Sequence, residues 1–305
     1  MFKHIVVPLD GSKLAEAVLP VVAYLAQRLG ASVTLLHVIE RNPPQEVHGE
    51  RHLTDEQEAY RYLKEVTQRT FPPGMAVDQH VHTTEVSDVP RSIVDHAGEL
   101  QTDLIALCTH GRSGPREWLF GPIAQQVVAL GTTPVLLVHP GEDQSEASFN
   151  CQNLLVPLDG NPEHEEGLQV AAGLARACTA SLHLVMVVHT VRTLPGEQAA
   201  TATLLPGATS AMLEISEQSA THYLENLEHS LENRGIKVTS QVERGDPAKK
   251  IVQAAEQSNS DLIILSTHGK THMDAFWSGS LTPKIAGRSH IPLILVPVGD
   301  EVDSK

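Results

Sequence analysis

The sequence predicts an α/β protein with two tandem doubly wound domains, each a five-stranded parallel sheet with helices on both faces. Three observations support this prediction. The chain has 305 residues, the length of two domains of ~150 residues each. The first half of the chain recurs in the second half. Within each half, short continuous apolar runs alternate with stretches of helical periodicity, a pattern typical of a parallel sheet that is buried on both faces.

The repeat consists of four segments that recur in the same order. They are residues 4–12 and 153–161, 31–38 and 180–188, 103–111 and 261–269, and 133–138 and 291–296. Counted from the first residue of each segment, the offset is 149 residues for the first two pairs and 158 for the last two, so the second copy carries a net insertion of nine residues. The segment 190–210, which is rich in small residues, is the expected place for most of the insertion. Colinear matches with one insertion indicate a tandem duplication.

These matches predict a first domain at 1–140, a linker at 141–152 and a second domain at 153–299. The linker is polar and has proline and glycine at its start, which predicts a short surface connection.

In the first domain, five strands are expected at 5–7, 32–38, 76–83, 103–108 and 134–138. Apolar residues at helical spacing predict a first helix from Leu14 to Leu29, although an interior Pro20 costs about 3 kcal/mol or forces a kink. A later helix is predicted around 59–70, with a counterpart around 220–231. Open sheets of this kind bind ligands beyond the carboxyl ends of their strands.

The charge balance argues against two classes of partner. The chain has 37 acidic and 22 basic residues, a net charge of −15, and no basic stretch. Nucleic acid and anionic membrane surfaces are therefore excluded as expected partners. No apolar run approaches the roughly 18 to 20 residues that a membrane span needs.

Cysteine use and the first residues predict a cytoplasmic protein. The three cysteines, Cys108, Cys151 and Cys178, form no CxxC pair, which fits a reducing compartment and buried thiols. The N-terminal segment reaches Pro8 and Asp10 too soon for a signal peptide.

An acidic residue follows the first strand of each copy. The first copy has Pro8-Leu9-Asp10, and the second has Pro157-Leu158-Asp159. One interpretation is a helix N-cap, in which a side-chain oxygen accepts the free amides of the first turn. The other is an acceptor for a ligand hydroxyl at the switch point of the sheet, as acidic residues bind ribose in dinucleotide folds. Both interpretations remain open at this stage.

A glycine loop follows the fourth strand of each copy. Its first part is Cys108 to Arg112 in one copy and Ser266 to Lys270 in the other, and a second glycine follows the first after nine residues, at Gly121 and Gly279. Glycine lets the backbone approach a phosphate, and the amides of the next helix attract anions. Arg112 or Lys270 would add a counter-charge.

This arrangement resembles the universal stress protein family, whose nucleotide-binding members carry G-x2-G-x9-G-[ST] after the fourth strand. The resemblance covers both copies and implies the adenine-nucleotide α-hydrolase-like fold with strand order 3-2-1-4-5. It implies binding of ATP, ADP or AMP, with or without Mg²⁺. In the second copy the implied nucleotide-binding residues are Pro157, Leu158, Asp159, Val188, Leu265, Ser266, His268, Gly269, Lys270, Gly279, Ser280 and Leu281. In the first copy they are Pro8, Leu9, Asp10, Val38, Leu107, His110, Gly111, Arg112 and Gly121.

The sequence departs from the family pattern in ways that favour the second copy as the binding site. The first motif glycine is replaced by Cys108 and by Ser266, and a side chain there is expected to narrow the loop. The motif hydroxyl is present as Ser280 but is replaced by Pro122 in the first copy. Proline suits the start of a helix but removes an N–H group from the phosphate cradle.

Three functions follow from these observations. The leading hypothesis is a stress-response protein that binds an adenine nucleotide and acts as a signalling or regulatory module. The second is a scaffold that binds partners but no nucleotide, and the third is slow ATP hydrolysis or autophosphorylation. GxSxG, HExxH and Walker motifs are absent, so no catalytic residue is assigned. His80 and His82 share a strand face without a third ligand at metal spacing, and no metal site is assigned.

The resemblance also implies how the two copies associate. Family domains pair through their last strands, so Val135–Val138 is expected to lie antiparallel to Leu293–Val296 within the chain. A homodimer remains an open alternative.

Overall fold

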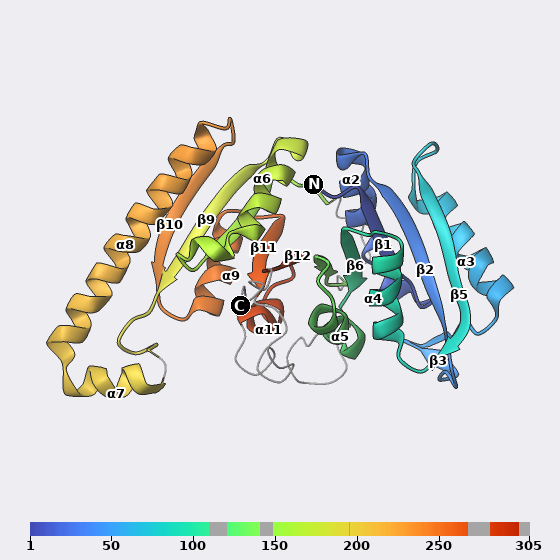
Figure 1. Ribbon diagram of the computed structural model, residues 1–305, viewed down its shortest axis with the longest axis horizontal. Coiled ribbons are helices and arrows are strands. Elements are labelled where there is room, and N and C mark those ends of the chain that lie inside the picture. The colour runs from blue at the N-terminus through green and yellow to red at the C-terminus, as the bar shows by residue number, and fades with distance from the viewer. Residues whose placement is uncertain (110–120, 141–148, 195, 268–280, 299–305) are drawn as a thin grey trace, which may run out of the picture.

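The computed structural model describes residues 1–109, 121–140, 149–194, 196–267 and 281–298. Within these ranges ten strands form one continuous sheet in the order β10-β9-β8-β11-β12-β7-β6-β1-β2-β5 (Figure 1). The strands of the first copy are β1 (His4–Pro8), β2 (Ser32–Glu40), β5 (Val77–Val86), β6 (Leu104–Cys108) and β7 (Val135–Val138). Those of the second copy are β8 (Asn153–Leu158), β9 (Ser181–Val188), β10 (Val238–Arg244), β11 (Leu262–Thr267) and β12 (Leu293–Pro297). A small hairpin, β3 (Glu46–Val47) and β4 (Glu50–Arg51), follows β2.

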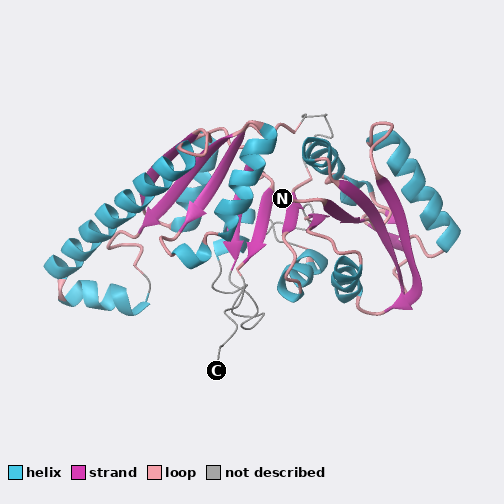
Figure 2. Ribbon diagram, turned by 45° about the horizontal axis from the view of Figure 1, so that its top comes forward, coloured by secondary structure: helices cyan, strands magenta, loops and turns pink. Residues whose placement is uncertain are grey.

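The helices cover both faces of this sheet (Figure 2). In the first copy they are α1 (Lys13–Glu16), α2 (Leu19–Leu29), α3 (Glu56–Thr70), α4 (Val89–Glu99) and α5 (Pro122–Leu130). In the second copy they are the 3-10 helix η1 (Pro162–His164), α6 (Glu166–Cys178), α7 (Gly196–Leu204), α8 (Pro206–Glu232), α9 (Pro247–Gln257) and α11 (Leu281–Ala286).

Each copy has five parallel strands in the spatial order third, second, first, fourth, fifth, which confirms the predicted fold class. The second copy repeats the same order. The strands are apolar on both sides because each side meets helices. Ile5, Val6 and Val7 are consecutive residues of β1, and all three are fully buried.

Two hydrophobic clusters fill the space between the sheet and its helices. One lies under α2, α3, α6 and α8, and the other lies under α4, α5, α9 and α11. Each cluster runs through both copies. Adjacent strand residues alternate between the clusters, as the pleat of a strand requires; Ile5 belongs to the first cluster and Val6 to the second.

The two copies join where β12 lies antiparallel to β7. Leu136 pairs with Ile294, and Val135 pairs with Leu295. This contact turns two five-stranded sheets into one sheet and removes two sheet edges, which would otherwise be open to association with other strands.

The first predicted helix is two helices in the structure. The helix α1 ends at Glu16, and α2 begins at Leu19 with Pro20 in its first turn. An amide of the first turn has no carbonyl partner within the helix, so a proline there sacrifices no hydrogen bond. The break before α2 therefore removes the conflict that Pro20 creates in a continuous helix.

The prediction of a surface linker is wrong at its carboxyl end. Cys151 is fully buried, and the Phe149 ring packs edge-on against Tyr24 of α2, with 5.4 Å between ring centroids. The segment 190–210, predicted to hold most of the insertion, contains α7 and the start of the long helix α8 (Figure 1). None of the helices in the described ranges combines the length and apolar character that crossing a membrane requires.

Candidate functional site: the carboxyl edge beside the first strand of each copy

The predicted site residues flank the point where strand order reverses in each copy. There β1 lies between β2 and β6, and β8 lies between β9 and β11. The structure describes thirteen of the predicted residues: Pro8, Leu9, Asp10, Val38, Leu107, Gly121, Pro157, Leu158, Asp159, Val188, Leu265, Ser266 and Leu281. The remaining eight lie outside the described residues: His110, Gly111, Arg112, His268, Gly269, Lys270, Gly279 and Ser280.

In the first copy, the carboxyl end of β1 is covered by the chain that follows β2. The two ring nitrogens of His37 lie 2.7 Å from the Leu9 carbonyl oxygen and 3.2 Å from the Leu53 carbonyl oxygen. Burial lowers the pKa of His37, against the opposing effect of these two carbonyls. The Leu53 side chain packs on Gly11, where an added Cβ would lie 2.8 Å from its Cγ. Leu9 itself is only 3% exposed and belongs to the hydrophobic cluster under α2 and α3.

The Asp10 carboxylate is engaged within the loop. Its Oδ1 accepts hydrogen bonds from the Ser12 amide at 2.9 Å and the Ser12 hydroxyl at 2.7 Å. Ser12 is the N-cap of α1, because its Oγ accepts the amide of Ala15 at 3.1 Å. The other oxygen of Asp10 lies 4.0 Å from Nε2 of His48, in the β3–β4 turn. Asp10 therefore orients the cap residue and is not itself the cap.

Cys108, at the end of β6, is a protonated thiol. Burial raises the pKa of Cys108 to about 12, and the charge of nearby Asp10 acts in the same direction. Its sulfur donates to the Thr109 carbonyl oxygen at 3.3 Å. A thiol with so high a pKa is a poor nucleophile.

In the second copy, the corresponding edge is more open. The side chain of Asp159 is 52% exposed, compared with 31% for Asp10. Its Oδ1 accepts the Asn161 amide at 2.9 Å, and its Oδ2 lies 2.5 Å from Nδ1 of His164. Asn161 is the N-cap of η1. Asp159 is thus held from two sides while its carboxylate still faces solvent.

A second carboxylate, Glu165, belongs to the surroundings of Asp159, because both act on the pKa of Tyr223. Glu165 accepts a hydrogen bond from the hydroxyl of Tyr223 on α8 at 2.5 Å. Burial raises the pKa of Tyr223, and the hydrogen bond to Glu165 and the charge of Asp159 add to that effect. The insertion-bearing helix α8 therefore contributes a side chain to the rim of this edge.

Ser266 has a structural partner on α6. Its Oγ accepts the amide of Gly167 at 3.0 Å, which satisfies an N–H group of the first helical turn. A Cβ at Gly167 would lie only 2.8 Å from this oxygen, so a glycine is needed there. The hydroxyl that replaces the motif glycine is therefore directed toward α6, whereas the sequence suggested a narrower loop.

Strand register identifies Val187, not Val188, as the counterpart of Val38. Pro8 pairs with Leu36, and Pro157 pairs with Val185, so the offset of 149 residues persists along the second strands. A shift of one residue moves a strand side chain to the other face. Val38 and Leu107 share one hydrophobic cluster, and Val187 and Leu265 share that same cluster. Val188 lies in the cluster on the opposite face.

Two neighbours of the predicted site residues were missed from the sequence. His164 was missed because its contact with Asp159 spans a short 3-10 turn without a motif, and Val187 was missed although the repeat offset specifies it. At the glycine loops, Gly121 is the N-cap of α5 with Pro122 as the first helical residue, and Leu281 is the first residue of α11.

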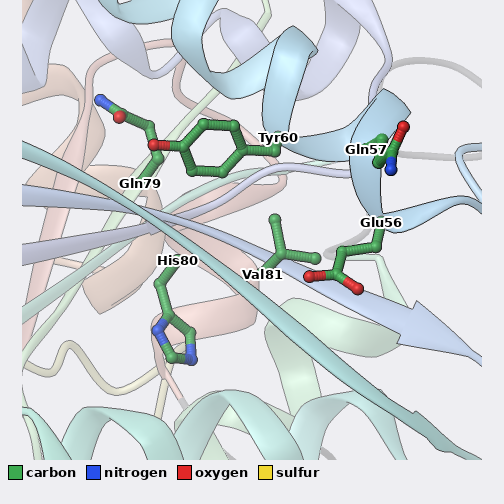
Figure 3. A pocket seen from close by; sticks show the side chains of 6 residues that line it. All are labelled: Glu56, Gln57, Tyr60, Gln79, His80 and Val81. Carbon is green, nitrogen blue, oxygen red and sulfur yellow. The ribbon is translucent and has the colours of Figure 1, made fainter.

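A separate hollow of about 450 Å³ lies between α3 and β5 (Figure 3). It is lined by Glu56, Gln57, Tyr60, Gln79, His80 and Val81, none of which is a predicted nucleotide-binding residue. In Figure 3 the His80 ring points to the other side of the strand from Tyr60. There the rings of His80 and His82 lie 5.0 and 4.7 Å from that of His96 on α4. No group of residues suited to hold a metal ion occurs in the part of the chain that the structure describes.

Comparisons with known proteins agree with this architecture. The model of the universal stress protein family matches residues 1–139 and 150–297. A universal stress protein of Mycolicibacterium smegmatis is 22% identical over 303 residues, 96% of each chain. One of Synechocystis sp. is 32% identical over 138 residues, 45% of this chain and 86% of that relative. The crystal structure of a universal stress protein from Archaeoglobus fulgidus covers 97% of both chains with a TM-score of 0.67 and 20% identity. The chain therefore belongs to the universal stress protein family, with one family domain in each half.

Proposed function

We propose that the second copy binds an adenine nucleotide at the carboxyl edge of β8 and that occupancy of this site regulates the protein in a cytoplasmic stress response. Asp159 would accept hydrogen bonds from ribose hydroxyls, and Pro157 and Leu158 would contact the base. The loop 268–280 would supply backbone amides to the phosphates, with Lys270 as counter-charge. ATP, ADP and AMP, with or without Mg²⁺, are the ligands to test.

The contrast between the two first-strand loops is the observation that supports the choice of copy. Asp159 is more exposed than Asp10, and Leu158 is half-buried where Leu9 is buried. The residue equivalent to His37 is Met186, which has no ring nitrogens to hold the loop backbone. An accessible, pre-oriented carboxylate loses little entropy when a ligand binds.

The first copy fits the scaffold hypothesis better than the nucleotide hypothesis. Its loop carbonyl at Leu9 contacts His37, Leu53 lies over Gly11, and Pro122 replaces the motif hydroxyl. We propose that this copy serves packing and domain pairing through β7 and β12, and that this pairing persists in solution.

Calorimetric titration of the full chain with ATP, ADP and AMP tests the proposal, with Asp159→Ala and Asp10→Ala as a matched pair. Loss of a hydrogen bond to a charged group costs about 1.5–3 kcal/mol, or roughly a 10- to 100-fold weaker Kd. We expect that loss for Asp159→Ala and unchanged affinity for Asp10→Ala. The reverse result would move the site to the first copy. No binding of any of the three at millimolar ligand would favour the scaffold, and turnover of ATP abolished by Asp159→Ala would favour the enzymatic hypothesis.

A further inference from the structure

Two of the three cysteines meet where the connection between the copies enters the second sheet. Cys151 lies two residues before β8, and Cys178 is the last residue of α6. The parallel ladder fixes their approach, because Asn153 pairs with Ser181 and the Ser181 amide donates to the Gln152 carbonyl at 2.8 Å. Both thiols belong to the same buried cluster, and they lie close enough for each to act on the pKa of the other.

The surroundings of this pair combine burial with one cation. Cys151 is fully buried and Cys178 is 8% exposed, so a small reagent reaches Cys178 first. Arg28, at the end of α2 in the first copy, acts electrostatically on both thiols. Its guanidinium lies 5.3 Å from the centre of the Tyr24 ring, which packs against Phe149 of the connection. The cation is therefore held in place by the same contacts that anchor the connection.

These surroundings favour ionisation of one specific thiol. The adjacent Cys151 thiol lowers the pKa of Cys178, and the charge of Arg28 lowers it further, while burial opposes both effects. The adjacent Cys178 and burial raise the pKa of Cys151. Cys178 is also the more exposed of the two thiols, so it is the one placed to attack, and Cys151 is the neighbouring thiol that can resolve an oxidised product.

We propose that Cys151 and Cys178 form an oxidisable dithiol that hydroperoxides convert to a disulfide, which ties the end of α6 to the connection between the two copies. The site is independent of the proposed nucleotide site.

The reaction consumes one hydroperoxide per disulfide. The Cys178 thiolate attacks the peroxide oxygen, the O–O bond breaks, and the released alkoxide or hydroxide takes the thiol proton to leave as alcohol or water. The sulfenic acid on Cys178 then reacts with the Cys151 thiol: an S–S bond forms, the S–O bond breaks, and water leaves. Two thiols are oxidised by two electrons, and the peroxide is reduced by two.

The test treats the reduced full-length chain with hydrogen peroxide, alkylates the remaining thiols after denaturation and maps the peptides by mass spectrometry. We expect a Cys151–Cys178 cross-linked peptide, with Cys108 alone alkylated. The disulfide closes a loop of 27 residues along the chain, so the melting temperature is expected to rise by about 5 °C or more. Cys108→Ser should leave both results unchanged, and Cys151→Ser should abolish the cross-link and leave a sulfenic acid on Cys178 that dimedone traps.

Arg28→Gln and Arg28→Lys test the role assigned to the cation. The rate of Cys178 oxidation should reach its half-maximal value at a higher pH in Arg28→Gln, while Arg28→Lys keeps the position of the profile. Three alkylatable thiols after peroxide treatment, or a disulfide that includes Cys108, would overturn the proposal.

Discussion

At the residue scale, a close packing contact near the candidate site of the second copy joins Ser266 and Gly167. The hydroxyl of Ser266 bonds to the Gly167 amide, and the backbone nitrogen of Ser266 would lie 3.1 Å from a Cβ at that glycine. The contact fixes the distance between the start of α6 and the end of β11. Because these two elements flank the loop that carries Asp159, the pair acts on the shape of the proposed nucleotide site without touching the ligand.

Gly167→Ala is expected to destabilise the protein although alanine is the better helix former. The new methyl group would lie 2.8 Å from Ser266 Oγ, and overpacking of this kind costs about 1–3 kcal/mol. Gly98→Ala is the matched control, because Gly98 lies in α4 with no atom within 4 Å of its added Cβ, and the same change there should stabilise by roughly 0.5–1 kcal/mol. Urea unfolding measures the change in the free energy of unfolding for each variant, which should be negative for Gly167→Ala and positive for Gly98→Ala. Equal changes in the two variants would show that α6 moves freely away from β11.

Sequence reasoning identified the residue types of the site and was less successful with their neighbours. Asp159 was predicted because strand, turn and acidic residue follow one another in both copies. The contact of His164 with Asp159 depends on the φ and ψ angles of a short turn, and no periodicity encodes those angles. The identity of Val187 was available in the repeat offset, but it depends on the register of β9, where an error of one residue reverses the face.

At the element scale, the strands were predicted closely because a short, continuous apolar run in an α/β protein usually forms a buried strand. Each expected strand of the first copy overlaps an observed one, and the ends differ by a few residues. The hairpin of β3 and β4 was not expected, since its sequence is polar and its strands have two residues each. Such short strands exist through contacts with other loops, in this case with Asp10 and Lys13, which local sequence does not reveal.

Replacing Pro20 at the start of α2 should change the free energy of unfolding in opposite directions for a continuous first helix and for the two separate helices of the structure. In a continuous helix, Pro20→Ala would stabilise the protein by about 3 kcal/mol, because the interior proline is removed. In the structure Pro20 is exposed and lies in the first turn of α2, so its replacement mainly increases the entropy of the unfolded chain. We therefore expect a loss of about 0.4–1 kcal/mol in the free energy of unfolding. A clear stabilisation in thermal or urea unfolding would contradict the break before α2.

At the scale of the whole molecule, duplication explains both the continuous sheet and its unequal sites. The two copies pair through their equivalent last strands, β7 and β12. A single rotation about an axis between these strands therefore brings the fold of one copy onto that of the other. The loops after the second strands then diverged, into a hairpin against the loop after β1 in the first copy and into α7 and the start of α8 in the second. The acidic residue of the candidate site is therefore less exposed in the first copy than in the second, a difference that strand patterns alone do not predict.

The contact between the copies also predicts how stability depends on pH. His139 follows β7, is 8% exposed, and its Nδ1 lies 2.7 Å from the Thr109 hydroxyl. Burial, and to a smaller extent the nearby His290, lower the pKa of His139 to about 4, although a hydrogen bond with the backbone of Ala286 on α11 opposes the shift. The folded protein therefore keeps this ring neutral where the unfolded chain, with an ordinary pKa of about 6.5, already binds a proton.

Stability should accordingly fall as the pH drops below about 6.5 and should level off, for this group, near its folded pKa of about 4. Between about pH 7.5 and pH 5 the loss attributable to His139 amounts to roughly 2 kcal/mol at most, since each pKa unit corresponds to about 1.4 kcal/mol. His139→Gln removes the titration, so urea unfolding at the two pH values should differ less for this variant than for the unchanged chain. His222→Gln, at a side chain that is 77% exposed, is the control and should leave the difference unaltered. If stability depends on pH in the same way for His139→Gln and His222→Gln, the His139 ring does not stay neutral in the folded protein. Another of the buried histidines would then account for the acid sensitivity.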